Sequence, residues 1–270
     1  MKYSDELNFA IDTAREAGKR IMKYFGRFES VGTGADNWSA TSIEADEASD
    51  TYIVSKIKSA YPEYSIFTEE SETHGNEYIW RVDPLDGTNN FKRGHHEFSV
   101  SMSLEKSGEL LLSIVYKPFY DEIFYAQSGE GAWSNRFRNR NPQKLHVSKE
   151  TSIEEAVISF NAAFFSPEYF DNGSKIIKSF SAFPLIRFRT KESTALDLSD
   201  TAAGCFTAHI GIAQSPWDYS AGILLVKEAG GIVTDFAGNP LVPPFSTCNI
   251  VASNGLVHDE ILKILKNVYK

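Results

Sequence analysis

The sequence contains only two cysteines in 270 residues, and Cys205 and Cys248 lie far apart along the chain. This spacing excludes a Cys-x-x-Cys pair and the dense disulfide framework of a small secreted domain. We expect both thiols to be buried as small apolar groups. No apolar run approaches the roughly 20 residues of a membrane span, and the first residues lack the apolar stretch of a secretory signal. The sequence therefore predicts a protein of the reducing cytoplasm without a membrane partner.

Positive charge is also scarce. The chain carries 27 Lys and Arg against 36 Asp and Glu, which gives a net charge of −9 and a pI near 5.2. Nucleic acid or an anionic membrane would require clustered basic residues, so neither is expected as the main partner. The 42% of hydrophobic residues can build the core of one large domain or of two closely packed lobes.

Hydrophobic spacing predicts mixed α and β structure. In the first half, apolar residues at helical spacing indicate helices over 4–25 and 42–60. The second half alternates strands with helices, which favours an α/β layer. The expected strands are 65–68, 78–82, 98–104, 110–116, 123–126, 156–160, 185–188, 209–212, 232–235 and 249–252, and the later helices are 167–180, 194–203, 215–229 and one beginning at His258.

Three polar segments have ordinary structural explanations. Residues 29–40 are rich in Gly and small polar residues, which indicates a mobile loop, and they lack the preceding strand of a dinucleotide-binding fingerprint. Glu47 and Asp50 lie near the expected start of the second helix, where the helix dipole favours acidic residues. Residues 135–142 form a basic loop that we expect to be an exposed turn, with substrate contact as the alternative.

The segment 83–88 reads Asp-Pro-Leu-Asp-Gly-Thr and follows a short apolar run. Asp83, the carbonyl of Leu85 and Asp86 could converge on a hard cation. The amides of Gly87 and Thr88, which open a helical turn, could hold an anion beside it. An Asp-Gly hairpin turn is the simple alternative, and an EF-hand loop is excluded because its other ligand positions are not met.

Two further acidic positions extend this pattern. Glu69 and Glu70 follow the expected strand 65–68, just as Asp83 follows the next strand, although an exposed turn would explain them equally well. Asp218 stands at the expected start of a helix, where an ordinary N-cap is the alternative.

Nearly the whole chain resembles the inositol monophosphatase family of magnesium-dependent, lithium-sensitive phosphatases. The motifs that carry this resemblance occur in the family's order: Glu69-Glu70-Ser71, the segment 83–88, Trp217-Asp218-x-x-Ala221-Gly222 and Glu228-Ala229-Gly230-Gly231. The resemblance implies a layered αβαβα sandwich of the inositol monophosphatase and fructose-1,6-bisphosphatase type that works as a homodimer. It divides the chain into an α+β lobe (1–145) with most metal ligands and an α/β lobe (146–270) with Asp218 and the substrate wall.

The resemblance implies two Mg²⁺ ions per subunit. Glu69, Asp83 and the Leu85 carbonyl resemble the ligands of the first ion. Asp83, Asp86 and Asp218 resemble those of the second. A third Mg²⁺ stays open, because no Lys or Arg occurs between Arg27 and Lys56, where many relatives keep a lysine.

The resemblance also implies catalytic roles. Thr88 and Glu69 resemble the pair that orients the attacking water, and Asp46 resembles an acid that hydrogen-bonds the motif threonine. Glu70 resembles an acid near the first metal. The amides of Gly87 and Thr88 would bind the phosphate.

The substrate wall departs from the family pattern. Glu192 stands where relatives have a small glycine, and Ser193 follows it in that wall. Gly211 replaces a glutamate with which many relatives bind inositol hydroxyls. The family's Gly-x-Pro is replaced by Gly94-His95-His96, and two adjacent histidines without a further partner are a weak zinc signal.

The sequence therefore predicts a Mg²⁺-dependent phosphomonoesterase that acts on a small inositol phosphate or sugar phosphate. Phosphatases for fructose 1,6-bisphosphate, NADP, 3′-phosphoadenosine 5′-phosphate or histidinol phosphate are the enzymatic alternatives. The alternative from another class is an inactive homologue that binds metal and a phosphorylated ligand as a regulatory module.

Overall fold

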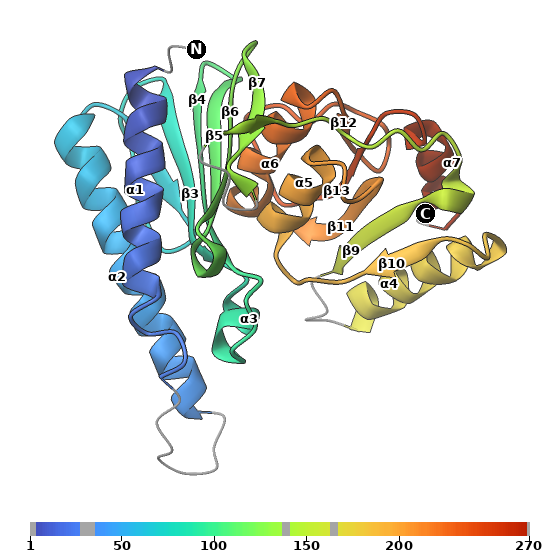
Figure 1. The fold of residues 1–270 in the computed structure, drawn as a ribbon, viewed down its shortest axis with the longest axis horizontal. Helices are drawn as coiled ribbons and strands as arrows, with labels where there is room; N and C mark the ends of the chain where they lie inside the picture. Colours follow the sequence, from blue (N-terminus) through green and yellow to red (C-terminus); the bar gives the residue numbers. More distant parts are fainter. Residues whose placement is uncertain (1–3, 28–35, 137–140, 163–166, 269–270) are drawn as a thin grey trace.

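The computed structural model describes residues 4–27, 36–136, 141–162 and 167–268, with the backbone alone for 36–40 and Pro167. Figure 1 shows five layers, in which three layers of helices alternate with two sheets. This is the αβαβα arrangement that the sequence predicted. The outer helices on the larger sheet are α1 (Asp5–Ile21) and α2 (Asp36–Ala60), those between the sheets are α5 (Thr194–Ala202) and α6 (Pro216–Glu228), and those on the smaller sheet are α4 (Pro167–Ser179) and α7 (His258–Val268).

The larger sheet has the strand order β2-β1-β3-β4-β5-β6-β7-β8. Its strands β1 and β3 are parallel, and every later pair is antiparallel, so β4, β5 and β6 form the expected meander. The strands are β1 (Ser65–Thr68), β2 (Glu72–Thr73), β3 (Tyr78–Asp86), β4 (Ser99–Lys106), β5 (Glu109–Lys117), β6 (Glu122–Gln127), β7 (Gly131–Ser134) and β8 (Gln143–Lys144).

The smaller sheet has the strand order β10-β9-β11-β13-β12 and mixes parallel with antiparallel pairs. Its strands are β9 (Val157–Ala162), β10 (Arg187–Arg189), β11 (Ala208–Gln214), β12 (Ile232–Asp235) and β13 (Cys248–Ser253). Short helical segments complete the fold: α3 (Thr88–Lys92) and the 3₁₀ turns Pro118–Tyr120, Ile153–Glu155 and Phe180–Ala182.

Alternate residues of the central strands pack into different layers. On β5, Ile114 belongs to the core under α1 and α2, and its neighbour Val115 belongs to the core around α5 and α6. A third core, which includes Ile158 and Ile210, lies between the smaller sheet and α4 and α7. Because strand side chains alternate between faces, one sheet can bury apolar residues on both sides.

The second helix is longer than the sequence predicted. α2 begins at Asp36 and not near Ser42, so the loop prediction is wrong for 36–40, while 29–35 lie outside the described residues. Glu47 and Asp50 therefore lie in the middle of a helix. Since the helix dipole acts only on the first turn, it does not explain these acidic residues.

Other differences are local. The short strands β2, β7 and β8 were missed, because two to four residues give too little alternation to detect. Cys205 is exposed and Cys248 is half-buried, so the prediction of buried thiols is wrong, although both are free as expected. Cys205 lies just after α5, where the guanidinium of Arg136 donates to its sulfur at 2.6 Å. The boundary between residues 145 and 146 remains a prediction.

Within the described ranges, every helix is either too short or too polar to cross a membrane.

Candidate active site

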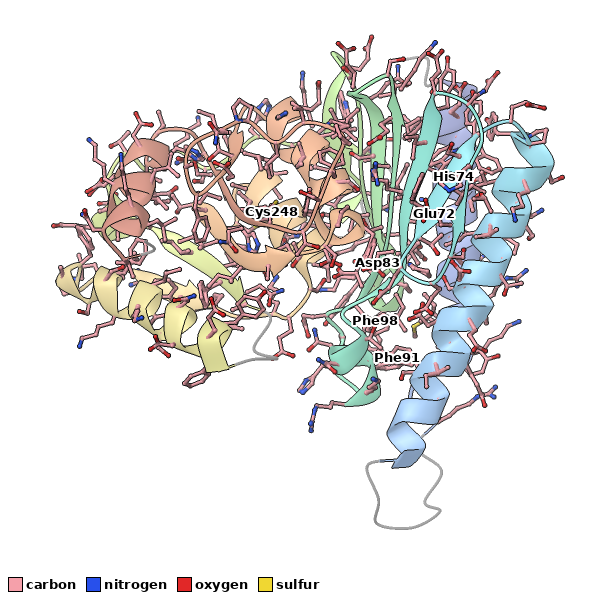
Figure 2. The ribbon with its side chains drawn as sticks, turned by 180° about the vertical axis from the view of Figure 1, so that it is seen from behind. Glu72, His74, Asp83, Phe91, Phe98 and Cys248 are labelled. Atoms are coloured by element: carbon pink, nitrogen blue, oxygen red, sulfur yellow. The ribbon has the colours of Figure 1, made fainter. Side chains whose placement is uncertain are left out.

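The site begins where two neighbouring strands bring acidic residues to one edge of the sheet. β1 and β3 are parallel, and Thr68 pairs with Val82, so Glu69, which directly follows β1, comes next to Asp83, which lies within β3. The two acids thus lie side by side, although Asp83 lies within β3 and not after it, and Glu69 lies in an exposed bend. Figure 2 shows Asp83 between the larger sheet and the elements of the second half of the chain.

A β-bulge places Asp83 and Asp86 on the same face of β3. Asp83 pairs with Ser101 and Asp86 with Ser99, so two residues of β3 lie opposite the single residue Val100. In a regular strand, residues three apart point to opposite faces, and one extra residue removes this difference. Both carboxylates therefore face the layer of α5 and α6.

Gly87 turns the chain from β3 into α3. Its φ of 83° lies in the left-handed region, which confirms the expected tight turn. A Cβ atom at this position would come within 2.6 Å of the Glu97 carbonyl oxygen. Phe91 anchors the short helix by packing edge-on against Phe98, with 5.2 Å between ring centroids (Figure 2). Glycine is therefore required both by the backbone and by the space around it.

The start of α5 holds Asp86. Asp86 Oδ2 accepts hydrogen bonds from Ser99 Oγ, at 2.8 Å, and from Ser193 Oγ. The backbone amides of Thr194 and Ala195 donate to the same carboxylate. The N-terminal end of a helix favours a negative charge, so α5 fixes this carboxylate against the larger sheet.

Asp218 comes from the first turn of α6. The N-cap of this helix is Ser215, whose amide donates to Asp218 Oδ2 at 2.9 Å in a capping box. Asp218 is thus the third residue of the helix and not its N-cap. Its carboxylate also lies within hydrogen-bonding reach of Asp83. One side chain therefore stabilises the helix start and takes part in the acidic site.

These carboxylates line one pocket with a volume of about 440 Å³. The motif residues form one part of it, and residues from the ends of β9 and β11 and from the starts of α5 and α6 form the walls. The lining residues are Glu69, Asp83, Leu85, Asp86, Gly87, Thr88, Asn89, Asn161, Ala162, Glu192, Thr194, Ala213, Gln214, Ser215, Trp217 and Asp218.

The carboxylates of this pocket hold protons more tightly than isolated ones. Burial raises the pKa of Asp83 well above its usual range, and the charges of Asp86 and Glu69 raise it further. Burial also raises the pKa of Asp86 to about 6, against the opposing effect of its hydrogen bonds from Ser193 and Ser99. Burial and the charge of Asp86 raise the pKa of Asp218 to about 7. Such crowding of buried negative charge requires either protons or cations.

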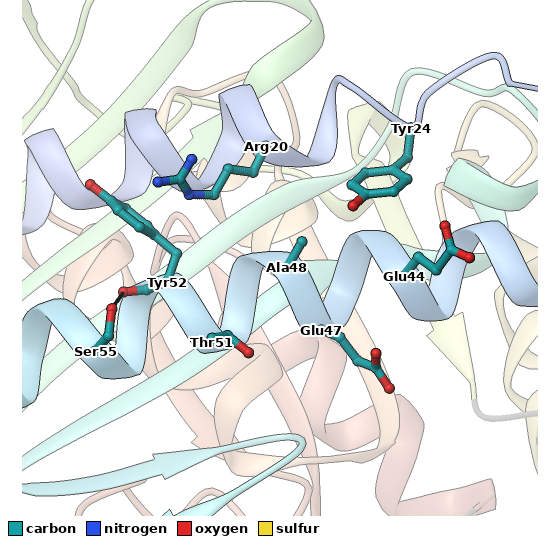
Figure 3. A pocket seen from close by; sticks show the side chains of 8 residues that line it. All are labelled: Arg20, Tyr24, Glu44, Glu47, Ala48, Thr51, Tyr52 and Ser55. Atoms are coloured by element: carbon teal, nitrogen blue, oxygen red, sulfur yellow. Dashed lines mark hydrogen bonds between the residues drawn. The ribbon is translucent and has the colours of Figure 1, made fainter.

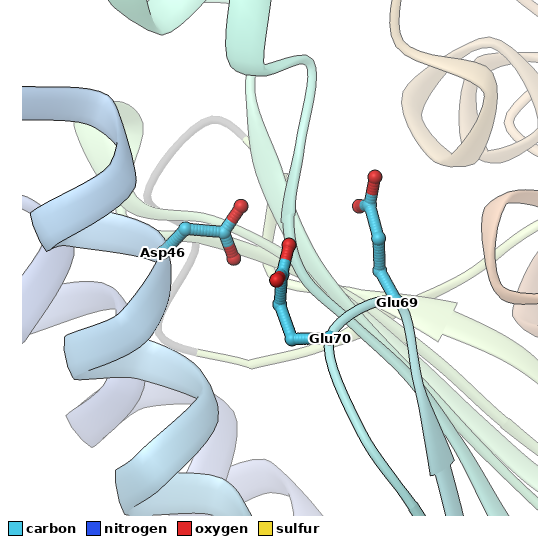
Figure 4. Close-up of side chains that lie close together, drawn as sticks. All are labelled: Asp46, Glu69 and Glu70. Carbon is cyan, nitrogen blue, oxygen red and sulfur yellow. The ribbon is translucent and has the colours of Figure 1, made fainter. Parts of the chain in front are cut away.

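A second acidic group lies beside the pocket. Ligand atoms of Asp46, Glu69 and Glu70 all lie within 4.8 Å of one another. Figure 4 shows Asp46 on α2 pointing toward Glu70, with Glu69 next to it. Burial, together with the charges of Glu69 and Glu70, raises the pKa of Asp46 to about 8. The role of Glu70 as an acid near the first metal remains a prediction.

Asp46 does not make the hydrogen bond that the resemblance implied. The Thr88 hydroxyl donates to the Leu85 carbonyl at 2.9 Å. Among the described residues, buried Asp46 Oδ1 has no hydrogen-bond partner. The role of Asp46 as the partner of Thr88 therefore stays a prediction.

The donor set fits a hard divalent cation. Glu69, Asp83, Asp86 and Asp218 supply oxygen ligands in one pocket, which is the ligand type that Mg²⁺ prefers. None of the described lining residues is Lys, Arg or His, so no basic side chain of the lining balances these carboxylates. Asp83, Asp86 and Asp218 share the pocket without belonging to the compact group of Asp46, Glu69 and Glu70.

The two predicted residues of the substrate wall have different positions. Glu192 is exposed and lines the pocket. Ser193 is completely buried behind Asp86, to which its hydroxyl donates, and it is absent from the lining residues. Direct contact between Ser193 and substrate remains a prediction. The burial of Ser193 behind Asp86 argues against it.

The basic and histidine candidates lie elsewhere. Lys92 and Arg93, two basic residues after the motif whose contact with a second phosphate of the substrate is a further prediction, are not among the lining residues, and Arg136 forms an ion pair with Asp200 at 3.2 Å. Residues 137–140 lie outside the described residues. The ring of His96 stacks on Phe119 with centroids 3.5 Å apart, and no metal-binding group of the described side chains includes it.

Several pocket residues were missed from the sequence. Asn161 ends the apolar strand β9, and a polar residue in that position is a detectable signal of a site. Ala213 and Gln214 precede the Trp-Asp motif and line the pocket because β11 also has a bulge, between Gly211 and Gln214. A bulge of this kind has no clear signal in the sequence.

The acidic pocket is not the largest cavity. A cavity of about 530 Å³ lies between α1 and α2, where the Arg20 guanidinium stacks over Tyr52 at 3.9 Å (Figure 3). Another, of about 720 Å³, lies beside α7. Neither contains the convergent carboxylates of the motif, so chemistry and not volume identifies the candidate active site.

Known proteins share this architecture. A model of the inositol monophosphatase family matches residues 2–270. The chain is 34% identical over 264 residues to the fructose-1,6-bisphosphatase/inositol-1-monophosphatase of Thermotoga maritima, covering 98% of this chain and 97% of that protein. It is also 34% identical over 265 residues to the Nus factor SuhB of Escherichia coli K12, and this match covers 97% of this chain and 96% of that protein.

Solved structures agree over the same length. The Thermotoga maritima IMPase superposes with a TM-score of 0.83 at 32% identity and covers 98% of each chain. The inositol monophosphatase of Anabaena superposes with a TM-score of 0.82 at 30% identity, covering 97% of this chain and 95% of that one. The layered fold is therefore that of the inositol monophosphatases. The chain belongs to the inositol monophosphatase family, whose members are generally magnesium-dependent phosphatases.

Proposed function

We propose that this protein is a Mg²⁺-dependent phosphomonoesterase that hydrolyses small phosphorylated metabolites. The observation that supports it best is the convergence of Glu69, Asp83, Asp86 and Asp218 in one pocket with Thr88 and the turn at Gly87. Family membership supports phosphatase activity in general, and the choice of substrate belongs to this proposal.

The carboxylates would hold two Mg²⁺ ions. Glu69, Asp83 and the Leu85 carbonyl would bind one, and Asp83, Asp86 and Asp218 the other. When bound, the ions neutralise phosphate oxygens, lower the pKa of water and stabilise the leaving alkoxide. A third ion is compatible with this proposal, because carboxylate oxygens of Asp46 and Glu70 lie close to Glu69 and could bind it.

Thr88 and Glu69 would position the attacking water. The Thr88 hydroxyl donates its hydrogen to the Leu85 carbonyl, so its oxygen remains an acceptor for a hydrogen bond from water. The Glu69 carboxylate can accept the other water proton, which directs the water oxygen toward phosphorus. The amides of Gly87 and Thr88 would donate to the phosphate oxygens.

The pocket does not favour strong selection of inositol. Gly211 has no side chain, and a Cβ atom there would come within 2.7 Å of Gln214 Cγ. Gln214 therefore occupies the space that a glutamate at position 211 would need. A missing hydrogen bond to a charged acceptor costs roughly 1.5 to 3 kcal/mol, which corresponds to about 10- to 100-fold in discrimination.

A phosphate-release assay with and without Mg²⁺ tests the function. We expect Mg²⁺-dependent hydrolysis of several small phosphoesters, with inositol 1-phosphate preferred over sugar phosphates by less than about 100-fold in kcat/KM. The panel includes fructose 1,6-bisphosphate, NADP, 3′-phosphoadenosine 5′-phosphate and histidinol phosphate. A larger preference for inositol 1-phosphate would show that another residue replaces the missing carboxylate.

The names of the SuhB relatives favour a second candidate, a regulatory protein that binds metal and a phosphorylated ligand without turnover. All the metal-binding side chains implied by the family are present, which favours the enzyme. The regulatory candidate would be supported by two results together: calorimetry shows that Mg²⁺ and inorganic phosphate bind, and no ester in the panel is hydrolysed.

The remaining family traits belong to the same proposal. We expect a cytoplasmic homodimer that is inhibited by lithium and has a small-molecule phosphoester as its substrate. The net charge of −9 favours a partner other than nucleic acid, while the Nus factor names of relatives make RNA binding a useful control experiment.

A further inference from the structure

We infer that Glu192 selects the alcohol part of the substrate, accepting hydrogen bonds from its hydroxyl groups and excluding a second phosphate. The inference rests on the proposed phosphatase function. It defines the substrate class as monophosphates of uncharged polyhydroxy alcohols, and it predicts discrimination against bisphosphates.

The first argument is the charge of the pocket. Five of its lining residues are acidic, and none of the described lining residues is Lys, Arg or His. Four of the five, Glu69, Asp83, Asp86 and Asp218, are assigned to the metal ions. Glu192 is therefore the carboxylate left to face the rest of the substrate, and a second phosphate would meet it without a compensating cation.

The second argument is the backbone of Glu192. Its φ of 56° lies in the left-handed region, where glycine is unstrained and a residue with a Cβ atom is not. The other described non-glycine residues with positive φ are Ser107, Asp121 and Ala213, and Ser107 and Asp121 lie in turns outside the pocket. Strained residues that persist next to a binding site commonly serve that site.

The third argument is that both neighbours of Glu192 are fixed. Asn90 Nδ2 donates to the Lys191 carbonyl at 2.5 Å, and the Ser193 hydroxyl donates to Asp86. The Lys191 ammonium pairs with Asp200, so the nearest cation along the chain is engaged elsewhere. In the described part of the chain, Glu192 itself enters no ion pair. Its negative charge at the pocket mouth therefore remains uncompensated.

The fourth argument is that the opposite wall offers no equivalent acceptor. Gln214 Oε1 accepts from the Thr194 hydroxyl, and Gln214 Nε2 donates to the Ile212 carbonyl at 2.7 Å. Asn161 Nδ2 donates to Thr194 Oγ1 at 2.9 Å. These side chains hold one another in a chain of hydrogen bonds. Glu192 is therefore the carboxylate that can accept hydrogen bonds from substrate hydroxyls.

A matched pair of esters tests the inference. Fructose 1-phosphate and fructose 1,6-bisphosphate share the ester at carbon 1 and differ by the phosphate at carbon 6, so hydrolysis at carbon 1, with fructose 6-phosphate as the product of the bisphosphate, is compared. The wild-type protein should show a kcat/KM at least about tenfold lower for the bisphosphate, as expected for one partly screened charge pair. Glu192→Gln should reduce that ratio about tenfold, mainly through KM, whereas Glu192→Asp, which keeps the charge, should retain most of it.

Binding supplies a readout that is independent of turnover. In a Thr88→Ala background with Mg²⁺, calorimetry should show the bisphosphate binding more weakly than the monophosphate, and the added Glu192→Gln change should remove the difference. Glu260, an exposed glutamate on α7, provides the matched control. Glu260→Gln should leave unchanged both the ratio of kcat/KM and the ratio of affinities for the two fructose esters.

The outcomes separate the two proposals. If p-nitrophenyl phosphate and both fructose esters are stable with Mg²⁺, the phosphatase proposal fails and this inference fails with it. If p-nitrophenyl phosphate is hydrolysed but Glu192→Gln leaves the ratio of the fructose esters unchanged, the inference alone is overturned. A wild-type preference for the bisphosphate would also overturn it.

Discussion

At the scale of single residues, Asp83 is a buried carboxylate whose pKa is raised by burial and by four other acidic residues. It is 2% exposed, and the charges of Asp86, Glu69, Asp218 and Asp46 all raise its pKa. In the proposed mechanism it is also the one side chain that touches both metal ions. Its substitution therefore tests the two-metal assignment most directly.

We expect Asp83→Asn to abolish nearly all turnover and to weaken Mg²⁺ binding strongly, because one bridging charge is lost from both ion sites. Without metal, the same change should raise the melting temperature, since one buried charge is removed from a crowded group. Calorimetry, a phosphate-release assay and thermal melting measure these effects. Asp12→Asn, on the exposed face of α1, is the control. Near-normal turnover in Asp83→Asn would refute the assignment.

Thr88 should behave differently from Asp83. Its hydroxyl contacts the Leu85 carbonyl and contributes no charge, so Thr88→Ala should leave Mg²⁺ affinity nearly unchanged. The loss of a positioned water should lower kcat on the order of 100-fold. Thr51→Ala, an exposed threonine on α2, should retain full activity. Unchanged kcat in Thr88→Ala would show that the water is held by other groups.

At the scale of elements, the turn from β3 into α3 depends on Gly87. Gly87→Ala places a Cβ atom against the Glu97 carbonyl and strains a residue with φ of 83°. We expect a loss of about 2 kcal/mol or more in the free energy of unfolding, measured with denaturant.

Gly26 provides a control for the backbone effect alone. Its φ is 74°, and a Cβ atom there meets no atom within 4 Å. Gly26→Ala should therefore cost only the left-handed strain, about 1 kcal/mol. If Gly87→Ala and Gly26→Ala lower the free energy of unfolding equally, a small movement of the backbone must relieve the contact with Glu97.

The sequence predicted the elements whose signals are local and periodic. The apolar runs of β4, β5 and β6 gave the meander, and helical spacing over 4–25 gave the first helix, which begins at Asp5 but ends at Ile21, before the predicted end. The motif acids Asp83 and Asp86 and the distant Asp218 were placed in one site through a family resemblance, and the structure brings them into one pocket. Periodicity alone would not have joined them.

The missed features depend on tertiary structure. The strained backbone at Glu192 and Ala213 and the bulge in β11 arise from strand pairing and packing, which leave no periodic signal. α2 extends back to Asp36 through Gly-poor polar residues that read as a continuation of a loop. Cys205 is exposed and accepts a hydrogen bond from Arg136, a residue 69 positions away, and a contact over this separation has no local signal in the sequence.

At the scale of the whole molecule, the acidic site links stability to pH. Without metal, the folded pKa values are about 8 for Asp46, about 6 for Asp86 and about 7 for Asp218, all above those of an unfolded chain. The folded state therefore binds more protons than the unfolded state between about pH 4 and 8, so stability should fall as pH rises through this window. Burial also raises the pKa of Asp197 well above its usual range, so this residue contributes to stability in the same direction.

Mg²⁺ should reverse much of this loss, because cations replace the missing protons. Melting temperatures in EDTA should decrease from about pH 5 to about pH 8, and the stabilisation by Mg²⁺ should grow over the same range. The Asp83→Asn protein should show a smaller gain with Mg²⁺. A metal-free protein that becomes more stable toward pH 8 would contradict the direction of these pKa shifts.

The bulge in β3 also limits how this segment can change in length. It shifts the inward and outward alternation of the strand by one step between Asp83 and Asp86. Loss of one residue there would restore regular pairing and leave the two aspartates two residues apart on the same face, but it would remove the extra residue of the bulge and disturb the Leu85 carbonyl that accepts from Thr88. Substitutions at Pro84 keep the bulge, whereas a single-codon deletion removes it. The number of residues between the two aspartates is thus more strictly constrained than their identity, and indels here should be far rarer in functional variants than point changes.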